Sequence, residues 1–351
     1  MNVDRRGFLS GAGAMVASLG VASGCSGGNP SPGTSKGKFS ITVLNPDCMV
    51  GGAGLCVVIR TPMGKTYLFD TANGDFKGKK KKNNGKDIIA PWLRANGIKE
   101  LDGVVITHYH ADHFGGFLWL KDNFPIKKVF DNSFVPNDGK PLGSHYEEEY
   151  KAAVTALKDW EKSRPGMLVS NTREGTELGW DEPGVKFDVV WPPKDHYCPV
   201  AKGHKMSSAT DFPFHHLLNA NSTCIRAVVG KKVFFLGGDT GDKAYSDEFI
   251  CPYLKKAGNW GCDVCVIPGH GSPANAANIA EMDPKPEIAV GSLGNLGWMM
   301  GCGRDVLAKH TAKGIVKTYC TNIHGDVTVE TDGESLRVSC DCGKLYRHDP
   351  V

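Results

Sequence analysis

The stretch VVITHYHADHFGG, residues 104–116, places four metal-binding side chains directly after an apolar run. The apolar run predicts a buried strand, and the polar residues follow where that strand ends. Beyond a strand end the backbone leaves the sheet, so side chains two positions apart can converge on one point. His108 and His110 are therefore predicted to face one metal ion, and Asp112 and His113 a second ion nearby.

These side chains also indicate which metals fit. Imidazole and carboxylate ligands suit zinc, and they suit manganese or iron when further oxygen ligands are present. The sequence thus predicts two divalent transition-metal ions, zinc first and manganese as the alternative. Gly115 and Gly116 follow the ligands, and we expect them to let the next helix approach closely.

Three more apolar runs end in the same chemistry. FFLGGDTG presents Asp239 and VIPGHGS presents His270, each where a predicted strand runs into a loop. One carboxylate in such a place can bridge two metals, so Asp239 is predicted to do so, with His270 as a further ligand. YLFDTANGD supplies Asp70, which we expect to orient the metal ligands from behind.

Runs rich in β-branched and aromatic residues alternate with runs of helical spacing along the rest of the chain. Two groups of strands separated by helices predict an α/β fold for residues 39–351. We expect two mixed β-sheets packed face to face with helices outside, a four-layer αββα sandwich. Strands are predicted at 39–45, 55–61, 65–71, 101–108, 185–193, 222–230, 231–239 and 262–270, and helices at 87–98 and 145–164.

The N-terminus predicts an export signal over residues 1–25 and a flexible tether over 26–38. Arg5-Arg6 before an apolar segment resembles a twin-arginine signal, and the residues up to Cys25 resemble a lipobox with Cys25 as the lipidated residue. The alternatives are a general secretory signal or an uncleaved anchor. We expect the protein in the cell envelope, bound to the membrane through a lipid anchor only.

Composition is that of an ordinary globular protein, with 40% hydrophobic and 23% charged residues and a formal net charge of +3. This near balance gives no indication of a general polyanion-binding surface, so contact with nucleic acid requires a local patch. Setting Cys25 aside leaves 11 of the 12 cysteines. Cys262 and Cys265 are predicted to be buried strand side chains rather than zinc ligands.

THYHADH, together with Asp70, Asp239 and His270, resembles the metallo-β-lactamase superfamily, whose first metal motif is HxHxDH. The flanking sequence most resembles the branch represented by a domain of the DNA-uptake channel protein ComEC. The resemblance implies that Asp112 orients a metal-bridging water and accepts its proton as the water becomes hydroxide, with Asp70 supporting the site. It implies a first metal held by His108 and His110, a second held by Asp112, His113 and His270, and Asp239 between them.

One ligand of the resembling families has no obvious counterpart in this chain. Most of the superfamily has a third histidine for the first metal, where this chain offers His215, His216, Asn219 and Asn221. Because the resembling branch often has asparagine there, we predict Asn221 as the ligand or substrate contact, with His216 as the alternative.

We therefore expect an exported dinuclear metal-dependent hydrolase. The resemblance and the lysine-rich run of residues 77–86 favour a phosphodiester, including nucleic acid, as substrate. A solvated surface loop is the simpler interpretation of the lysines. The alternatives are a hydrolase of carbonyl substrates such as a lactam, lactone or thioester, and a non-catalytic metal-containing binding module of the envelope.

Overall fold

The structure, a computed structural model, describes residues 37–45, 54–74, 83–136, 145–202, 212–271, 279–294, 308, 310–315 and 317–341. The predicted export signal with Cys25, nearly all of the predicted tether, and Lys77 to Lys82 lie outside the described residues. Within these ranges no helix is both long enough and apolar enough to cross a membrane.

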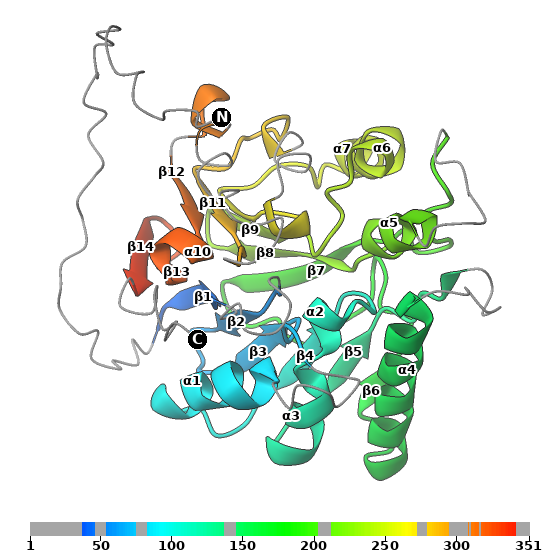
Figure 1. The fold of residues 1–351 in the computed structure, drawn as a ribbon. Helices are drawn as coiled ribbons and strands as arrows, with labels where there is room; N and C mark the ends of the chain where they lie inside the picture. Colours follow the sequence, from blue (N-terminus) through cyan, green and yellow to red (C-terminus); the bar gives the residue numbers. More distant parts are fainter. Residues whose placement is uncertain are drawn as a thin grey trace, which may run out of the picture.

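The first sheet runs in the order β14-β13-β1-β2-β3-β4-β5-β6 (Figure 1). It is mixed: neighbours from β14 to β3 pair antiparallel, and neighbours from β3 to β6 pair parallel. The strands are β1 (Phe39–Val43), β2 (Val57–Arg60), β3 (Thr66–Phe69), β4 (Gly103–Ile106), β5 (Val129–Asp131), β6 (Leu168–Val169), β13 (Asp326–Thr331) and β14 (Leu336–Asp341).

The second sheet runs in the order β12-β11-β10-β9-β8-β7. It is mixed as well, with parallel pairing from β12 to β9 and antiparallel pairing from β9 to β7. The strands are β7 (Val185–Trp191), β8 (Cys224–Val229), β9 (Lys232–Leu236), β10 (Val264–Val266), β11 (Ile288–Gly291) and β12 (Lys317–Cys320).

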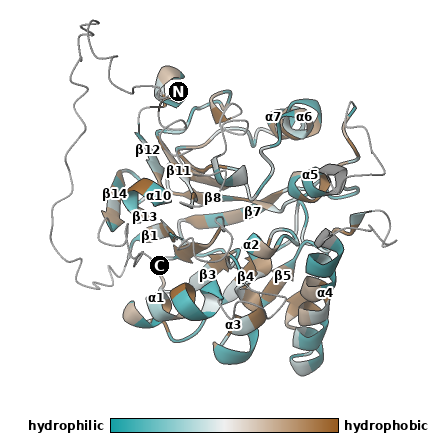
Figure 2. Cartoon of the chain, viewed as in Figure 1, coloured by the Kyte–Doolittle hydropathy of each residue, from teal (hydrophilic) through white to brown (hydrophobic). Residues whose placement is uncertain are grey.

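Three apolar layers hold the sheets and helices together. Strand side chains alternate between faces, so Val105 of β4 packs between the sheets while Val104 and Ile106 pack under the outer helices. Between the sheets, the Phe39 ring lies 5.0 Å from that of Phe234. Figure 2 accordingly shows apolar colour concentrated on the central strands and polar colour on outward helix faces.

The helices lie on the two outer faces (Figure 1). Helices α1, α3 and α4 cover the first sheet, and α5, α6 and α7 lie on the side of the second. The helical segments are η1 (Gly85–Ile89), α1 (Ala90–Ala95), α2 (Ala111–Phe114), α3 (Phe117–Asn123), α4 (His145–Ser163), α5 (Phe212–Ala220), α6 (Lys243–Tyr245), η3 (Ser246–Ile250), α7 (Cys251–Lys256), η4 (Gly269–Gly271) and α10 (Thr321–His324).

This architecture confirms the predicted fold class of two mixed sheets between helices. The predicted helices correspond to η1 with α1 and to α4. The predicted strand 262–270 is shorter than expected, since pairing covers only Val264–Val266 before Pro268 and Gly269 turn the chain. Strands β5, β6 and β11 and helix α5 are among the elements that were not predicted.

Candidate metal centre

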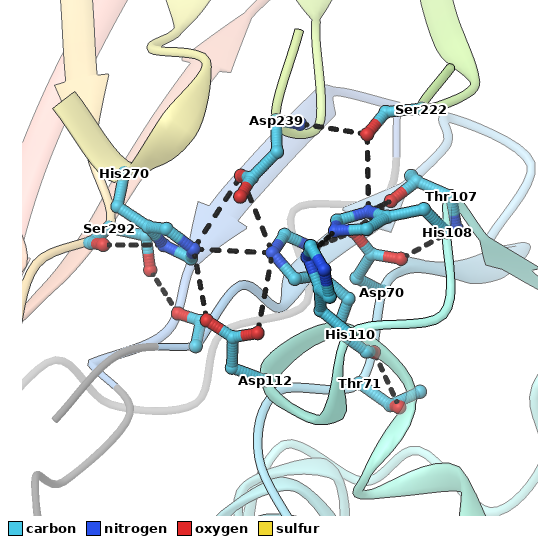
Figure 3. A network of polar contacts seen from close by, with 12 residues as sticks. Asp70, Thr71, Thr107, His108, His110, Asp112, Ser222, Asp239, His270 and Ser292 are labelled. Carbon is cyan, nitrogen blue, oxygen red and sulfur yellow. Dashed lines mark hydrogen bonds and ion pairs between the residues drawn. The ribbon is translucent and has the colours of Figure 1, made fainter. Parts of the chain in front are cut away.

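The predicted ligands meet at one edge of the molecule because of how the strands are paired. Strands β3 and β4 are parallel, with Phe69 opposite Val105, and β9 and β10 are parallel, with Leu236 opposite Val266. Parallel strands end at the same edge of a sheet, so the loops after β3 and β4 lie together, as do those after β9 and β10. Contacts of His113 with Asp239 and of His270 with Asp112 join the two pairs of loops. Figure 3 shows side chains from these loops pointing toward one another.

Six of the predicted residues form two groups in which one ligand atom from each residue lies within 4.8 Å of the others. Each group combines two imidazoles with one carboxylate, a donor set that suits a divalent transition metal. The first group is His108, His110 and Asp239, and the second is Asp112, His113 and His270.

Asp239 lies between the two groups. Its Oδ1 is 3.4 Å from Nε2 of His113 and 3.5 Å from Nε2 of His270, both members of the second group. Within the first group, Nε2 of His108 and Nδ1 of His110 are 2.8 Å apart, so these two nitrogens face the same point. The arrangement is consistent with a dinuclear site that shares Asp239.

Asp70 holds His113 from behind. Its Oδ2 is 2.7 Å from Nδ1 of His113, which leaves Nε2 directed at Asp239. Thr107 donates to the same carboxylate from its backbone N–H and its hydroxyl, at 2.8 and 2.7 Å. Asp70 is fully buried. These contacts fit the predicted orienting role of Asp70.

Two other histidines are oriented by groups that the sequence did not reveal. Nδ1 of His270 lies 3.1 Å from the carbonyl oxygen of Ser292. Nδ1 of His108 lies 3.1 Å from the hydroxyl of Ser222, which also accepts a hydrogen bond from the Asp239 backbone N–H. Such partners fix the ring orientation of a metal-binding histidine.

Burial and charge prepare these groups to bind cations. Burial lowers the pKa of His108 and of His110 well below the usual range, so both are neutral bases. Burial alone also lowers the pKa of His113, but the carboxylates around it, chiefly Asp239 and Asp70, outweigh burial and raise that pKa well above its usual value. The carboxylates thus favour positive charge at this point, which a proton or a metal ion can supply.

The two carboxylates of the groups stay ionised. Burial alone raises the pKa of Asp239, but His270 and His113 outweigh it and hold that pKa well below its usual value. His113 and His270 lower the pKa of Asp112 against burial in the same way. Both residues therefore present full negative charge to the centre of the site.

Backbone strain is concentrated at the same edge. Asp70 and His270 each have a φ of 59°, in the left-handed region that side chains other than glycine rarely adopt. Such strain persists only where surrounding contacts enforce it, and it clusters at functional sites. Both residues carry the hydrogen bonds described above, which supply that enforcement.

The structure places Asn221 and His216, the predicted third ligand of the first metal and its alternative, in contacts within the protein. Both ends of the Asn221 side-chain amide make hydrogen bonds within the protein. Its oxygen accepts from the Cys198 N–H at 2.7 Å, and its NH₂ donates to the carbonyls of Cys198 and Leu217. His216 instead pairs with Asp242 at 2.8 Å.

His215, on helix α5, is the nearby residue that reaches the first group. Its ring is stacked on that of His110 at 4.4 Å between centroids. Its Nδ1 lies 3.2 Å from Nε2 of His110, the nitrogen that faces away from His108. His215 therefore contacts a predicted ligand from its outer side.

The donor set passes a test of fit for metal. Among the described residues no hydrogen bond reaches Oδ1 of Asp239, although this buried oxygen lies near Nε2 of both His113 and His270. A buried carboxylate oxygen in such surroundings is satisfied by a cation. Cys262 and Cys265 take no part, since both are buried in the core as predicted.

The family model described as "Metallo-beta-lactamase superfamily" matches residues 49–195, which include Asp70 and the whole HxHxDH motif. This match agrees with the two observations made above, the fold of two mixed sheets and the paired His/Asp groups. Over these residues the chain is therefore similar to the metallo-β-lactamase superfamily. It has the metallo-β-lactamase fold of a metal-dependent hydrolase, with the two groups as its candidate metal sites.

Two known proteins, a competence protein and a ComE operon protein, are similar to parts of this chain. Competence protein ComA of Neisseria gonorrhoeae is 26% identical over 243 residues, which cover 69% of this chain and 26% of ComA. ComE operon protein 3 of Bacillus subtilis is 34% identical over 84 residues, 21% of this chain and 11% of that protein. The chain thus corresponds to only a minor part of each relative.

Solved structures are more distant. The metallo-β-lactamase fold protein YhfI from Bacillus subtilis is 13% identical and has a TM-score of 0.44, with 84% of this chain and 100% of YhfI covered.

Proposed function

We propose that this metallo-β-lactamase-fold hydrolase is an exported dinuclear phosphodiesterase with nuclease-like activity. The observation that carries the dinuclear part is the position of Asp239 between two His/Asp groups, with its buried Oδ1 near two imidazoles. Two bound divalent metals would lower the pKa of a shared water and stabilise negative charge on the substrate.

Asp112 is the residue we assign to proton transfer. It is the most exposed member of the two groups, with 25% of its side chain exposed against 7% for Asp239. Its Oδ2 lies 3.3 Å from Nε2 of His270. A carboxylate at this opening can orient an attacking water and accept its proton. Asp70 supports it indirectly by fixing His113.

A phosphodiester is favoured as substrate by the resemblance to the ComEC branch and by the similarity to competence protein ComA and ComE operon protein 3. The described residues on either side of the lysine-rich run lie near the metal-binding turn. Gly74 and Asn83, on either side of it, form a β-bridge, and the Asn83 amide donates to the Gly115 carbonyl at 2.9 Å. The run therefore leaves and rejoins the described chain beside the metal-binding turn.

The test is a substrate panel with the purified, metal-loaded protein. We expect cleavage of bis(p-nitrophenyl) phosphate and of single-stranded DNA or RNA, and little cleavage of a lactam, lactone or thioester. Asp112→Asn should lower kcat by about 100-fold or more because it removes the proton acceptor. Cleavage of carbonyl substrates alone would replace the phosphodiesterase assignment, and no cleavage at full metal content would favour a binding module.

Export and lipid anchoring are separate proposals that rest on the sequence of residues 1–25. Replacing Arg5 and Arg6 together by Lys should leave the protein inside the cell. Cys25→Ser should release the exported protein from the membrane fraction, as followed by immunoblotting of cell fractions. Membrane attachment that survives the Cys25 change would exclude the lipid anchor.

A further inference from the structure

The turn that carries the predicted ligands is attached to the rest of the protein from behind. His108 and His110 point to the metal centre, and Tyr109 between them points the opposite way and is buried. Its hydroxyl donates to Oδ2 of Asp131, at the end of β5, at 2.9 Å. Burial raises the pKa of Tyr109 well above the usual value, so the hydroxyl stays a donor.

A second attachment lies one residue after His110. The backbone N–H of Ala111 donates to Oε2 of Glu149 at 2.8 Å. Ala111 is the first residue of helix α2, and the residue before it, His110, makes no side-chain hydrogen bond that caps the helix. A carboxylate from another helix thus satisfies an N–H that the short helix leaves open.

Glu149 is itself well placed to hold this position. It lies near the start of α4, the end of the helix that stands at the level of α2 in Figure 1. Farther along α4, Ala153, Leu157 and Trp160 are buried against the first sheet. The carboxylate is therefore carried by a packed helix rather than by a loop.

We propose that Glu149 is a positioning residue of the metal centre. By holding the N–H of Ala111, it fixes the turn between His110, of the first metal group, and Asp112, of the second. The inference depends on the proposed metal centre and not on the nature of the substrate. It deepens that proposal by adding a residue from α4, which contributes none of the predicted ligands.

Three variants separate position from charge. Glu149→Ala removes both the acceptor and the charge, whereas Glu149→Gln keeps an acceptor oxygen and removes the charge. Glu148→Ala is the matched control, since this exposed neighbour on α4 loses the same charge. A fourth variant, Ala111→Pro, removes the donor instead. Proline suits the first position of a helix, and the preceding residue, His110, already has the extended φ of −81° and ψ of 141° that proline requires.

The measurement is Co²⁺ affinity of the full chain by chelator competition, with the cobalt absorption spectrum recorded at saturation. We expect Glu149→Ala and Ala111→Pro each to weaken binding by about 10- to 100-fold and to alter the spectrum, as loss of an outer partner of a ligand does. Combining the two should add little, because both break the same hydrogen bond. Glu149→Gln and Glu148→Ala should bind Co²⁺ like the parent.

Several results would overturn the inference. If Glu149→Ala and Ala111→Pro bind Co²⁺ like the parent, the hydrogen bond does not position the centre. If Glu149→Gln is as weak as Glu149→Ala, the residue acts through charge alone. If Glu149→Ala does not fold, the comparison of Ala111→Pro with the parent decides in the same way. A parent protein that binds no Co²⁺ would instead remove the metal centre itself.

Discussion

At the scale of single residues, each predicted ligand histidine divides its two ring nitrogens between the metal centre and the protein. His113 is the clearest case, since Asp70 holds Nδ1 at 2.7 Å while Nε2 faces Asp239 at 3.4 Å. The second group has only Asp112 and His270 besides it.

We therefore predict that His113→Ala lowers the bound metal by about one ion per chain, since it removes one of three ligands from one site. Mass spectrometry of the metals in purified protein measures this content. His216→Ala is the control, because His216 pairs with Asp242 and belongs to neither group. Equal metal content in His113→Ala and the parent would contradict the assignment of the second group.

His215 gives a second residue-scale prediction. Because it contacts the outer nitrogen of His110, His215→Ala should weaken metal binding at the first site by about 10- to 100-fold and leave the second site loaded. Titration of metal-free protein with Zn²⁺ should then show two binding events, of which one is weaker than in the parent. The same His216→Ala control applies, and two unchanged steps would show that the stacking of His215 on His110 does not support the site.

At the scale of elements, the metal-binding turn packs against its neighbours without room for side chains. A Cβ at Gly116 would lie 2.0 Å from the Thr71 carbonyl oxygen, and one at Gly115 would lie 2.1 Å from the Gly74 backbone nitrogen. The sequence predicted that these glycines allow a close approach by the following helix. The structure shows that the element that approaches is the loop after β3, which also carries Asp70.

Gly116→Ala should consequently lower the free energy of unfolding by about 2 kcal/mol or more, since the backbone must shift to relieve the contact. Urea unfolding measures this change. Gly97→Ala is the control: its φ of +71° strains a side chain, but a Cβ there meets nothing within 4 Å. Gly97→Ala should lower the free energy of unfolding by about 1 kcal/mol. If both variants lose the same free energy of unfolding, the loop after β3 can shift to accommodate a Cβ at Gly116 at little cost.

The ligands at the strand ends could be predicted because the apolar run and the His or Asp residues that follow it are neighbours in the sequence. An apolar run followed by His or Asp specifies a strand and what stands at its end, and parallel pairing then brings those ends together. The partners that orient the ligands could not be predicted in this way. The Ser292 carbonyl that holds His270 has no sequence signature, and Glu149 reaches Ala111 across 38 positions of the chain.

The position of Asn221 relative to the metal groups could not be predicted for a related reason. Residues near 220 offered several side chains of suitable chemistry, and only tertiary contacts select among them. Asn221 bonds to Cys198, 23 positions away, whereas His215 faces the site because it lies on α5, a helix whose sequence was not recognised. Ligand identity within a stretch of the chain is therefore decided by packing rather than by residue type.

At the scale of the whole molecule, Asp112 and Asp239 bring negative charge to the metal-centre edge. A polyanionic substrate needs positive charge beyond the metals to approach this edge. The lysine-rich run, joined to the described chain at Gly74 and Asn83, is the sequence feature that can provide it. A small phosphodiester should depend on it far less.

Replacing Lys79, Lys80, Lys81 and Lys82 by Ser should therefore raise the KM for single-stranded DNA or RNA by about 10-fold at low salt and reduce its dependence on salt. The kcat for bis(p-nitrophenyl) phosphate should change little, because the metal groups are untouched. A control with the same change in charge replaces the lysines that precede β3, β4 and β5, at the opposite edge of the sheet: Lys65, Lys99, Lys127 and Lys128. Lys65 and Lys127 pair with Asp102 and are themselves half-exposed, so a urea unfolding curve of the control should first show that it is folded. If the two four-lysine variants lose cleavage of nucleic acid to the same extent, net charge rather than the placement of the lysine-rich run attracts the substrate. If the variant of the lysine-rich run cleaves nucleic acid like the parent, the run takes no part in binding. The nucleic-acid assignment then loses its local support.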